Sequence, residues 1–98
     1  MIRAVFVKEG FTLSGHAGYA DAGSDIVCAA VSAMANLVCN AAEAFGAQAE
    51  IHAEEEGATL SYRLAAGCKE AEKLLAVFRE ELRELENQYP KNIRVEIQ

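Results

Sequence analysis

Residues 48–64, QAEIHAEEEGATLSYRL, decide the fold class of this 98-residue chain. In each half of the stretch, small or apolar side chains alternate with polar ones, which is the period of a strand with one buried face and one wet face. The Glu55-Glu56-Gly57 run between the two halves predicts a turn. The stretch therefore predicts two antiparallel strands in a sheet that is covered on one side.

The flanking sequence predicts two helices and three more strands. One later segment carries a single apolar stripe opposite charged side chains, typical of an amphipathic helix, and Pro90 ends it. The earlier helical segment, residues 25–45, is apolar nearly all round and ends near Gly46. Glu9-Gly10 predicts a hairpin turn between the first two strands. The order ββαββαβ predicts an α+β fold with a mainly antiparallel sheet and two helices packed on one face. The predicted strands are 2–8, 11–16, 48–53, 58–64 and 93–97, and the predicted helices are 25–45 and 69–88.

Composition predicts one domain over residues 1–98, with about half of its residues apolar and a net charge of −6. Because no run is rich in Lys or Arg, nucleic acid and anionic membranes are poor candidates for a direct partner, and a basic partner or substrate fits better. The segment 26–42 is apolar, but alanine dominates it and Ser32, Asn36 and Asn40 interrupt it. We expect a buried helix of a cytoplasmic protein there rather than a membrane span.

The cysteines and the second histidine predict no metal site and no cofactor. The chain has an odd number of cysteines, and none of them form a CxxC pair: Cys28, Cys39 and Cys68. Cys39 and Cys68 are best interpreted as small buried side chains, and His52 as a solvated surface residue of a strand.

Two short motifs carry the only recognisable chemistry: Gly15-His16-Ala17 and, after a glycine-containing loop, Asp25-Ile26-Val27-Cys28. Ser24 and Asp25 predict the N-cap and first turn of the helix. Cys28 then lies within about one turn of the helix N-terminus, where free N–H groups and the dipole favour a thiolate. We expect His16 to end the preceding strand and to fold back so that its imidazole meets the thiol of Cys28. A thiolate near an imidazole is the minimum that a cysteine nucleophile needs. On spacing alone, an inert thiol beside an unrelated histidine is the commoner arrangement.

The run GHA, a glycine-containing loop and DIVCAAVSA (residues 25–33) resembles the ribosomal-processing cysteine proteases, the Prp family of bacteria. Chain length and element order fit the same family. The resemblance implies a thiol protease with Cys28 as nucleophile and His16 as general base, acting on a peptide substrate in ribosome biogenesis. That substrate is the short N-terminal extension of a large-subunit ribosomal protein, number twenty-seven of that series, cut after aromatic residues.

Further site residues are expected around this pair. Asp25 either orients His16 or only caps the helix. Gly15, Tyr19 and Ser32 are candidate substrate-binding residues, although Ser32 fits equally well as a small polar residue at a tight helix contact.

The expected chemistry also needs an oxyanion site and an apolar pocket. Backbone N–H groups at the helix start are natural oxyanion donors, because they lack intrahelical partners. The nearby apolar candidates for an aromatic substrate side chain are Phe6, Phe11, Leu13 and Tyr19.

The first helix also predicts a homodimer, because one sheet face cannot bury a helix that is apolar nearly all round; the family resemblance implies the same. Two other functions stay open. One is a non-catalytic, ribosome-associated binding module with Cys28 merely buried. The other is a different thiol enzyme or a redox sensor, although Cys39 is too far along the helix to resolve an oxidised Cys28.

Overall fold

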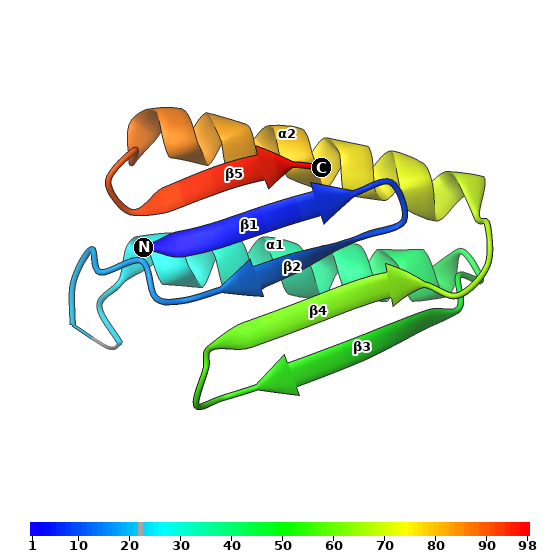
Figure 1. Ribbon diagram of the computed structural model, residues 1–98, viewed down its shortest axis with the longest axis horizontal. Helices are drawn as coiled ribbons and strands as arrows, with labels where there is room; N and C mark the ends of the chain where they lie inside the picture. The colour runs from blue at the N-terminus through cyan, green and yellow to red at the C-terminus, as the bar shows by residue number, and fades with distance from the viewer. Residues whose placement is uncertain (22) are drawn as a thin grey trace.

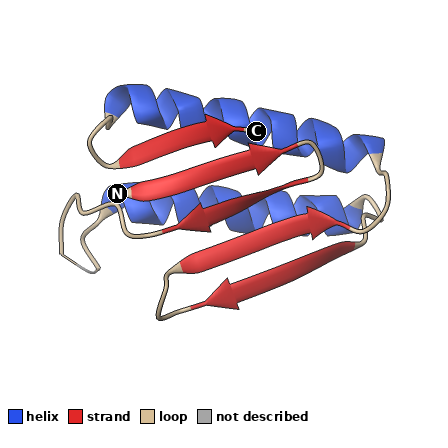
Figure 2. Ribbon diagram, viewed as in Figure 1, coloured by secondary structure: helices blue, strands red, loops and turns tan. Residues whose placement is uncertain are grey.

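A five-stranded sheet with both helices on one face forms the fold in a computed structural model, which describes residues 1–21 and 23–98 (Figures 1 and 2). The element order ββαββαβ and the placement of the helices confirm the predicted α+β class. The elements are β1 (Ile2–Val7), β2 (Gly10–Ser14), α1 (Ile26–Ala44), β3 (Ala49–Glu54), β4 (Thr59–Leu64), α2 (Lys69–Gln88) and β5 (Ile93–Ile97).

The strands lie in the order β3-β4-β2-β1-β5. β1 and β5 are parallel, while β1–β2, β2–β4 and β3–β4 are antiparallel. The sheet is therefore mainly antiparallel, as the alternation in residues 48–64 predicts. β3 and β5 form its two edges, and both helices lie behind the same face in Figure 1.

The first hairpin turns one residue earlier than the sequence predicts. Val7 pairs with Gly10, so Lys8 and Glu9 make the turn and Gly10 belongs to β2. A Cβ atom at Gly10 would lie 2.1 Å from the carbonyl oxygen of Tyr62 in β4. This glycine is therefore needed for the close approach of two strands rather than for a turn.

An aromatic cluster forms the centre of the core between the sheet and α2. The Phe78 ring packs edge-on against Phe6 and Phe11, with centroid distances of 5.6 and 5.0 Å, and Phe11 stacks on Tyr62 at 5.4 Å. All four side chains are buried. Full burial of a phenylalanine contributes roughly 1.5–3 kcal/mol, so this cluster is a principal source of stability.

α1 packs on the sheet through Val27, Val31, Ala35, Val38 and Ala42. α1 is long and apolar enough to cross a membrane. The core helix of a soluble protein meets the same criteria of length and composition. The buried stripe of small and β-branched residues gives α1 a structural role in the core.

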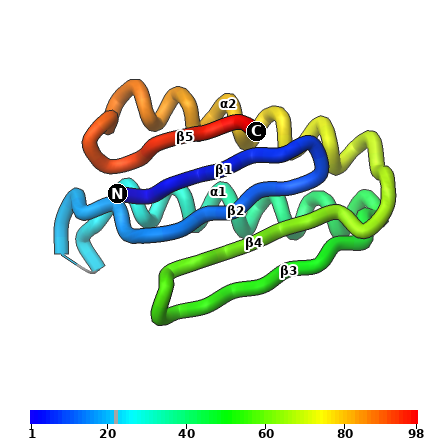
Figure 3. The backbone as a smooth tube through the Cα atoms, viewed as in Figure 1, coloured from blue at the N-terminus to red at the C-terminus, as the bar shows by residue number. Residues whose placement is uncertain are grey.

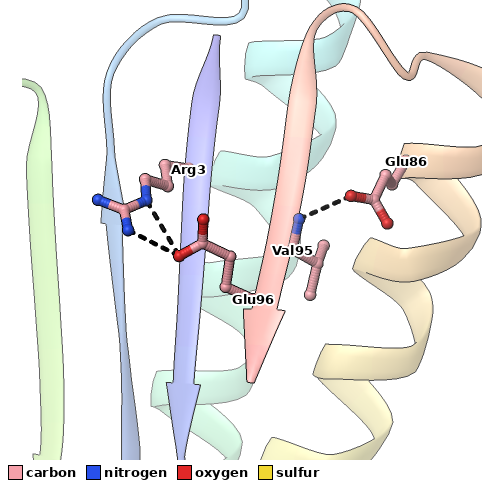
Figure 4. A network of polar contacts seen from close by, with 4 residues as sticks. All are labelled: Arg3, Glu86, Val95 and Glu96. Atoms are coloured by element: carbon pink, nitrogen blue, oxygen red, sulfur yellow. Dashed lines mark hydrogen bonds and ion pairs between the residues drawn. The ribbon is translucent and has the colours of Figure 1, made fainter. Parts of the chain in front are cut away.

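The exposed edge of β5 is covered by a side chain from α2 (Figure 4). The outward N–H of Val95 donates a 2.9 Å hydrogen bond to Glu86, which blunts an otherwise open strand edge. On the next residue, Glu96 accepts hydrogen bonds of 3.1 and 2.7 Å from Arg3 of β1. The Arg3 guanidinium lowers the pKa of Glu96, and Glu96 in turn raises the pKa of Arg3.

Candidate active site

Three connections gather at one end of the sheet: the β2–α1 loop, the β3–β4 turn and the α2–β5 turn (Figures 1 and 3). The N–H of Gly15 donates to the carbonyl of Ala58 in the β3–β4 turn at 3.1 Å. The Nδ2 group of Asn92, in the α2–β5 turn, donates to the carbonyl of Ala17 at 3.0 Å. His16 thus lies between two residues that are held by different parts of the chain.

Gly15 is required at the end of β2 for two reasons. Its φ of +87° lies in the left-handed region, which side chains disfavour. A Cβ atom there would also lie 2.5 Å from the carbonyl oxygen of Met1. The turn that presents His16 therefore depends on this glycine.

Asp25 is the N-cap of α1, as the capping alternative for this residue predicts, and Ser24, the other candidate cap, lies one residue before it. Its Oδ1 atom accepts hydrogen bonds from the N–H groups of Val27 and Cys28, both at 3.0 Å. Its Oδ2 atom accepts from the N–H of Tyr19 at 3.1 Å. The hydrogen bond from Cys28, followed by those from the loop, lowers the pKa of Asp25. One carboxylate therefore joins the helix start to the loop that precedes it.

Cys28 and His16 line the same two cavities. The first, of about 390 Å³, lies between α1 and the β3–β4 turn, and we call it the groove. The second, of about 540 Å³, lies over the loop that leads into α1. Cys28 is half-buried and His16 is exposed. The Sγ atom of Cys28 accepts a 3.3 Å hydrogen bond from the N–H of Ala17, the residue next to His16.

The other expected site residues divide into two groups. Gly15 and Ser32 line the groove together with His16 and Cys28. Tyr19 does not line it; its ring packs edge-on against Tyr89 with a centroid distance of 5.4 Å.

The carboxylate of Asp25 is directed at backbone N–H groups. Among the described residues, no hydrogen bond or ion pair joins Asp25 to His16. The geometry of Asp25 is therefore that of a helix cap.

The expectation of an aromatic pocket built from Phe6 and Phe11 is wrong. Both rings are buried in the central cluster, with 3% and 2% of their surface exposed. Leu13, by contrast, lines the groove. The apolar walls of the groove are aliphatic and consist of Ile2, Leu13, Val31, Ala35, Ala53, Ala58 and Leu60.

Three N–H groups at the helix start already have acceptors in this structure. Val27 and Cys28 donate to the Asp25 carboxylate, and Ala29 donates to the Asp25 carbonyl at 3.1 Å. An oxyanion that used any of these three would have to displace its present acceptor.

The other two cysteines lie away from this site. Burial raises the pKa of Cys39, which keeps its thiol protonated and slow to react. Cys68 occupies the N-cap position of α2 without a side-chain hydrogen bond to the helix backbone, and its Sγ atom lies 3.7 Å from a carboxylate oxygen of Glu70. Within residues 1–21 and 23–98, no group of three His, Cys, Asp or Glu side chains is arranged to hold a metal ion.

Three residues that contact the site loop had no signal in the local sequence. Asn92 and Tyr89 belong to the α2–β5 turn, and Ala58 belongs to the β3–β4 turn. Asn92 and Ala58 contact the loop by hydrogen bonds and Tyr89 by ring packing, all at long sequence separation, which hydrophobic periodicity does not encode.

A half-buried thiol at a helix start and an exposed imidazole on the same groove are the parts of a cysteine peptidase site. The family model described as cysteine protease Prp matches residues 1–94. The chain belongs to the cysteine protease Prp family, and it is accordingly a cysteine-type peptidase.

Solved structures agree with this assignment. An essential ribosomal processing protease Prp from S. aureus, in complex with a covalently linked product peptide, has a TM-score of 0.94 at 25% identity, with 100% of both chains covered. The same S. aureus protease with a substrate peptide has a TM-score of 0.88 at 24% identity, also with full coverage. SMU.848 from Streptococcus mutans has a TM-score of 0.86 at 28% identity, covering 99% of this chain and 93% of that one. A comparison with curated protein sequences gives no match.

Proposed function

We propose that this peptidase removes the short N-terminal extension of a large-subunit ribosomal protein, number twenty-seven of that series, with Cys28 as nucleophile and His16 as general base. The observation that carries the proposal is that both side chains line one groove beside the start of α1. Family membership supports it, since a ribosomal processing protease of the family has been solved with a substrate peptide and with a covalently linked product peptide.

The two side chains would divide the chemistry between them. His16 takes the proton from the Cys28 thiol as Sγ attacks the carbonyl carbon of the scissile bond. His16 then returns that proton to the leaving amine, which leaves a thioester on Cys28. Water, deprotonated by His16, attacks the thioester carbonyl, and the acid product leaves as the thiol takes back its proton. No metal or cofactor is required for these steps.

The N–H of Ala17 supports the nucleophile in this scheme. It already donates to Sγ at 3.3 Å, which holds the sulfur atom beside the segment that carries His16. Its position next to His16 brings the donor and the base to the same side of the groove.

The groove is suited to an extended peptide. Its walls are mainly aliphatic, while Ser32 and Asn36 of α1 and Glu54 and Glu55 of the β3–β4 turn add polar groups. Apolar walls with a few polar groups are the usual lining of a ligand site. The net charge of −6 favours a basic protein as the substrate and fits a cytoplasmic enzyme that meets ribosomal proteins.

We also propose that the enzyme works as a homodimer through the outer side of its helices. Leu37 of α1 and Val77 of α2 are 69% and 61% exposed. They border an apolar cavity of about 150 Å³ that is also lined by Met34 and Leu74. Such a patch is best covered by a second copy.

Light scattering tests the dimer. The wild type should have twice the monomer mass at micromolar concentration, and Leu37→Glu should reduce the measured mass to that of the monomer. A monomeric wild type would contradict the dimer.

The substrate is tested by intact mass. The ribosomal protein with its N-terminal extension is incubated with the enzyme, and a version that begins at the mature N-terminus serves as the control. One discrete cut behind an aromatic residue, absent in the control, is expected. An uncut protein, together with a Cys28 that does not react with iodoacetamide, would instead leave a non-catalytic binding module.

A further inference from the structure

Ala17 is the most firmly held residue of the segment that carries His16. Only 2% of its surface is exposed, whereas its neighbours His16 and Gly18 are both exposed. Its N–H donates to Sγ of Cys28 at 3.3 Å, and its carbonyl accepts from Nδ2 of Asn92 at 3.0 Å. Both backbone polar groups and the methyl group of Ala17 thus have defined partners. The position of the peptide bond between His16 and Ala17 depends on them.

Asn92 can hold this carbonyl because it is itself fixed. Its N–H donates to the carbonyl of Tyr89 at 2.9 Å, and its carbonyl accepts from the N–H of Ile2 at 2.8 Å. The turn is therefore tied to the end of α2 and to the first residue of β1. The Tyr89 ring, packed edge-on against Tyr19 at 5.4 Å, adds a second contact between this turn and the loop.

We infer that Asn92 is a positioning residue for the proposed Cys28–His16 pair, an inference that rests on the proposed function. Its side-chain amide fixes Ala17 from the carbonyl side, so that the N–H on the other side stays directed at Sγ. The same contact fixes the backbone from which His16 projects. A displacement of about 1 Å at a reacting group can reduce a rate by about a hundredfold.

The chemistry of the contact requires a donor at Asn92. An amide NH₂ donates to a carbonyl, whereas an ionised carboxylate of the same shape only accepts. Asn92→Asp therefore replaces attraction with repulsion between two oxygen atoms. Asn92→Ala removes the donor without adding charge. Asn87→Asp, at an exposed position in the last turn of α2, makes the same charge change without touching the loop.

The experiment compares these three variants with the wild type in peptide cleavage and in alkylation of Cys28 at one fixed pH. We expect Asn92→Asp and Asn92→Ala to lower kcat by roughly 10- to 100-fold. KM should stay within about threefold, because Asn92 does not line the groove. Alkylation of Cys28 should slow in both variants, and Asn87→Asp should match the wild type.

Several results would overturn the inference. One is a wild-type kcat in Asn92→Ala, since a loss in the Asp variant alone would be an effect of charge. Another is a loss of rate that matches the loss of folded protein in a thermal melt. If neither variant folds, amide hydrogen exchange on the wild type decides. The Ala17 amide should exchange at least tenfold more slowly than that of Gly18, and equal rates would contradict the inference.

These readouts separate the inference from the proposed function. Neither measurement needs a substrate: alkylation of the variants tests Asn92, and exchange of the Ala17 amide tests how firmly Ala17 is held, even if no ribosomal protein is cut. Conversely, cleavage that survives Cys28→Ala would contradict the proposed function, whatever Asn92 does.

Discussion

The backbone N–H of Ala17 donates a 3.3 Å hydrogen bond to Sγ of Cys28, eleven positions further along the chain. This single contact joins the segment after β2 to the first turn of α1. It places the residue next to His16 directly at the thiol, and the side chains of Cys28 and His16 share a groove even though His16 is exposed. The contact is made by a backbone donor, and the carbonyl of the same residue accepts a hydrogen bond from the side chain of Asn92.

Asp25→Ala should weaken both the start of α1 and the site loop. The substitution removes the acceptor for the N–H groups of Val27, Cys28 and Tyr19. We expect the melting temperature to fall by roughly 4–8 °C. Asp25→Asn should lose less, because its side-chain oxygen can still cap the helix. Circular dichroism melts of the two variants test this; equal losses would show that the cap contributes little.

Stability should fall in acid through Asp25 and Glu96. Both carboxyls have a folded-state pKa below the unfolded value, so each stabilises the fold fully above about pH 5. That contribution disappears as the pH falls through the lowered folded-state pKa. Melting temperatures measured from pH 7 to pH 2.5 should decline below about pH 4. Glu96→Gln should flatten the decline, and an unchanged slope in that variant would assign the acid sensitivity to other groups.

Gly10→Ala should disrupt the pairing of β2 with β4. The new methyl group would start 2.1 Å from the Tyr62 carbonyl oxygen, which is backbone and cannot move without shifting β4. We expect a loss of about 2 kcal/mol or more in the free energy of unfolding, measured in urea. Gly67→Ala is the matched control, because a Cβ atom there meets nothing within 4 Å. A tolerated Gly10→Ala would mean that the two strands lie further apart than described.

Phe78→Ala should remove the ring that joins α2 to the sheet. Phe78 is 1% exposed and packs against Phe6 and Phe11. The free energy of unfolding should fall by about 3–5 kcal/mol. Phe45→Ala deletes the same ring from a 60% exposed position and should change it far less. Similar losses in the two variants would contradict the placement of the core.

The fold could be predicted from the sequence because its elements are strongly periodic. Residues 48–64 alternate cleanly, and residues 69–88 carry one apolar stripe, so the strand pair and the second helix appear where they are expected. The buried face predicted for the first of these strands is wrong, because β3 is the edge strand and is exposed from Glu50 to Glu54, with Ile51 51% exposed. The sequence predicts a turn at Gly10, because glycine is common in turns, whereas the residue lies in β2 where two strands approach closely. That requirement is tertiary and leaves no local pattern.

The site could be predicted only in part for the same reason. The motifs predict Cys28 and His16, and both line the groove. The expectation that Phe6 lines a substrate pocket is wrong, because alternation does not say which part of the covered face lies under the aromatic core and which borders the groove. The contact from Asn92 to Ala17 spans 75 positions. No local pattern in the sequence indicates such a contact.

The most direct test of the central claim is the cleavage rate of a substrate peptide by Cys28→Ala, His16→Ala and the double variant, with His52→Ala and Cys68→Ala as controls. We predict that each of the first two loses at least about a thousandfold in kcat/KM and that the double variant is no worse than either, because the two residues act as one unit. The controls should match the wild type. A His16→Ala enzyme that cleaves at the wild-type rate would contradict the account.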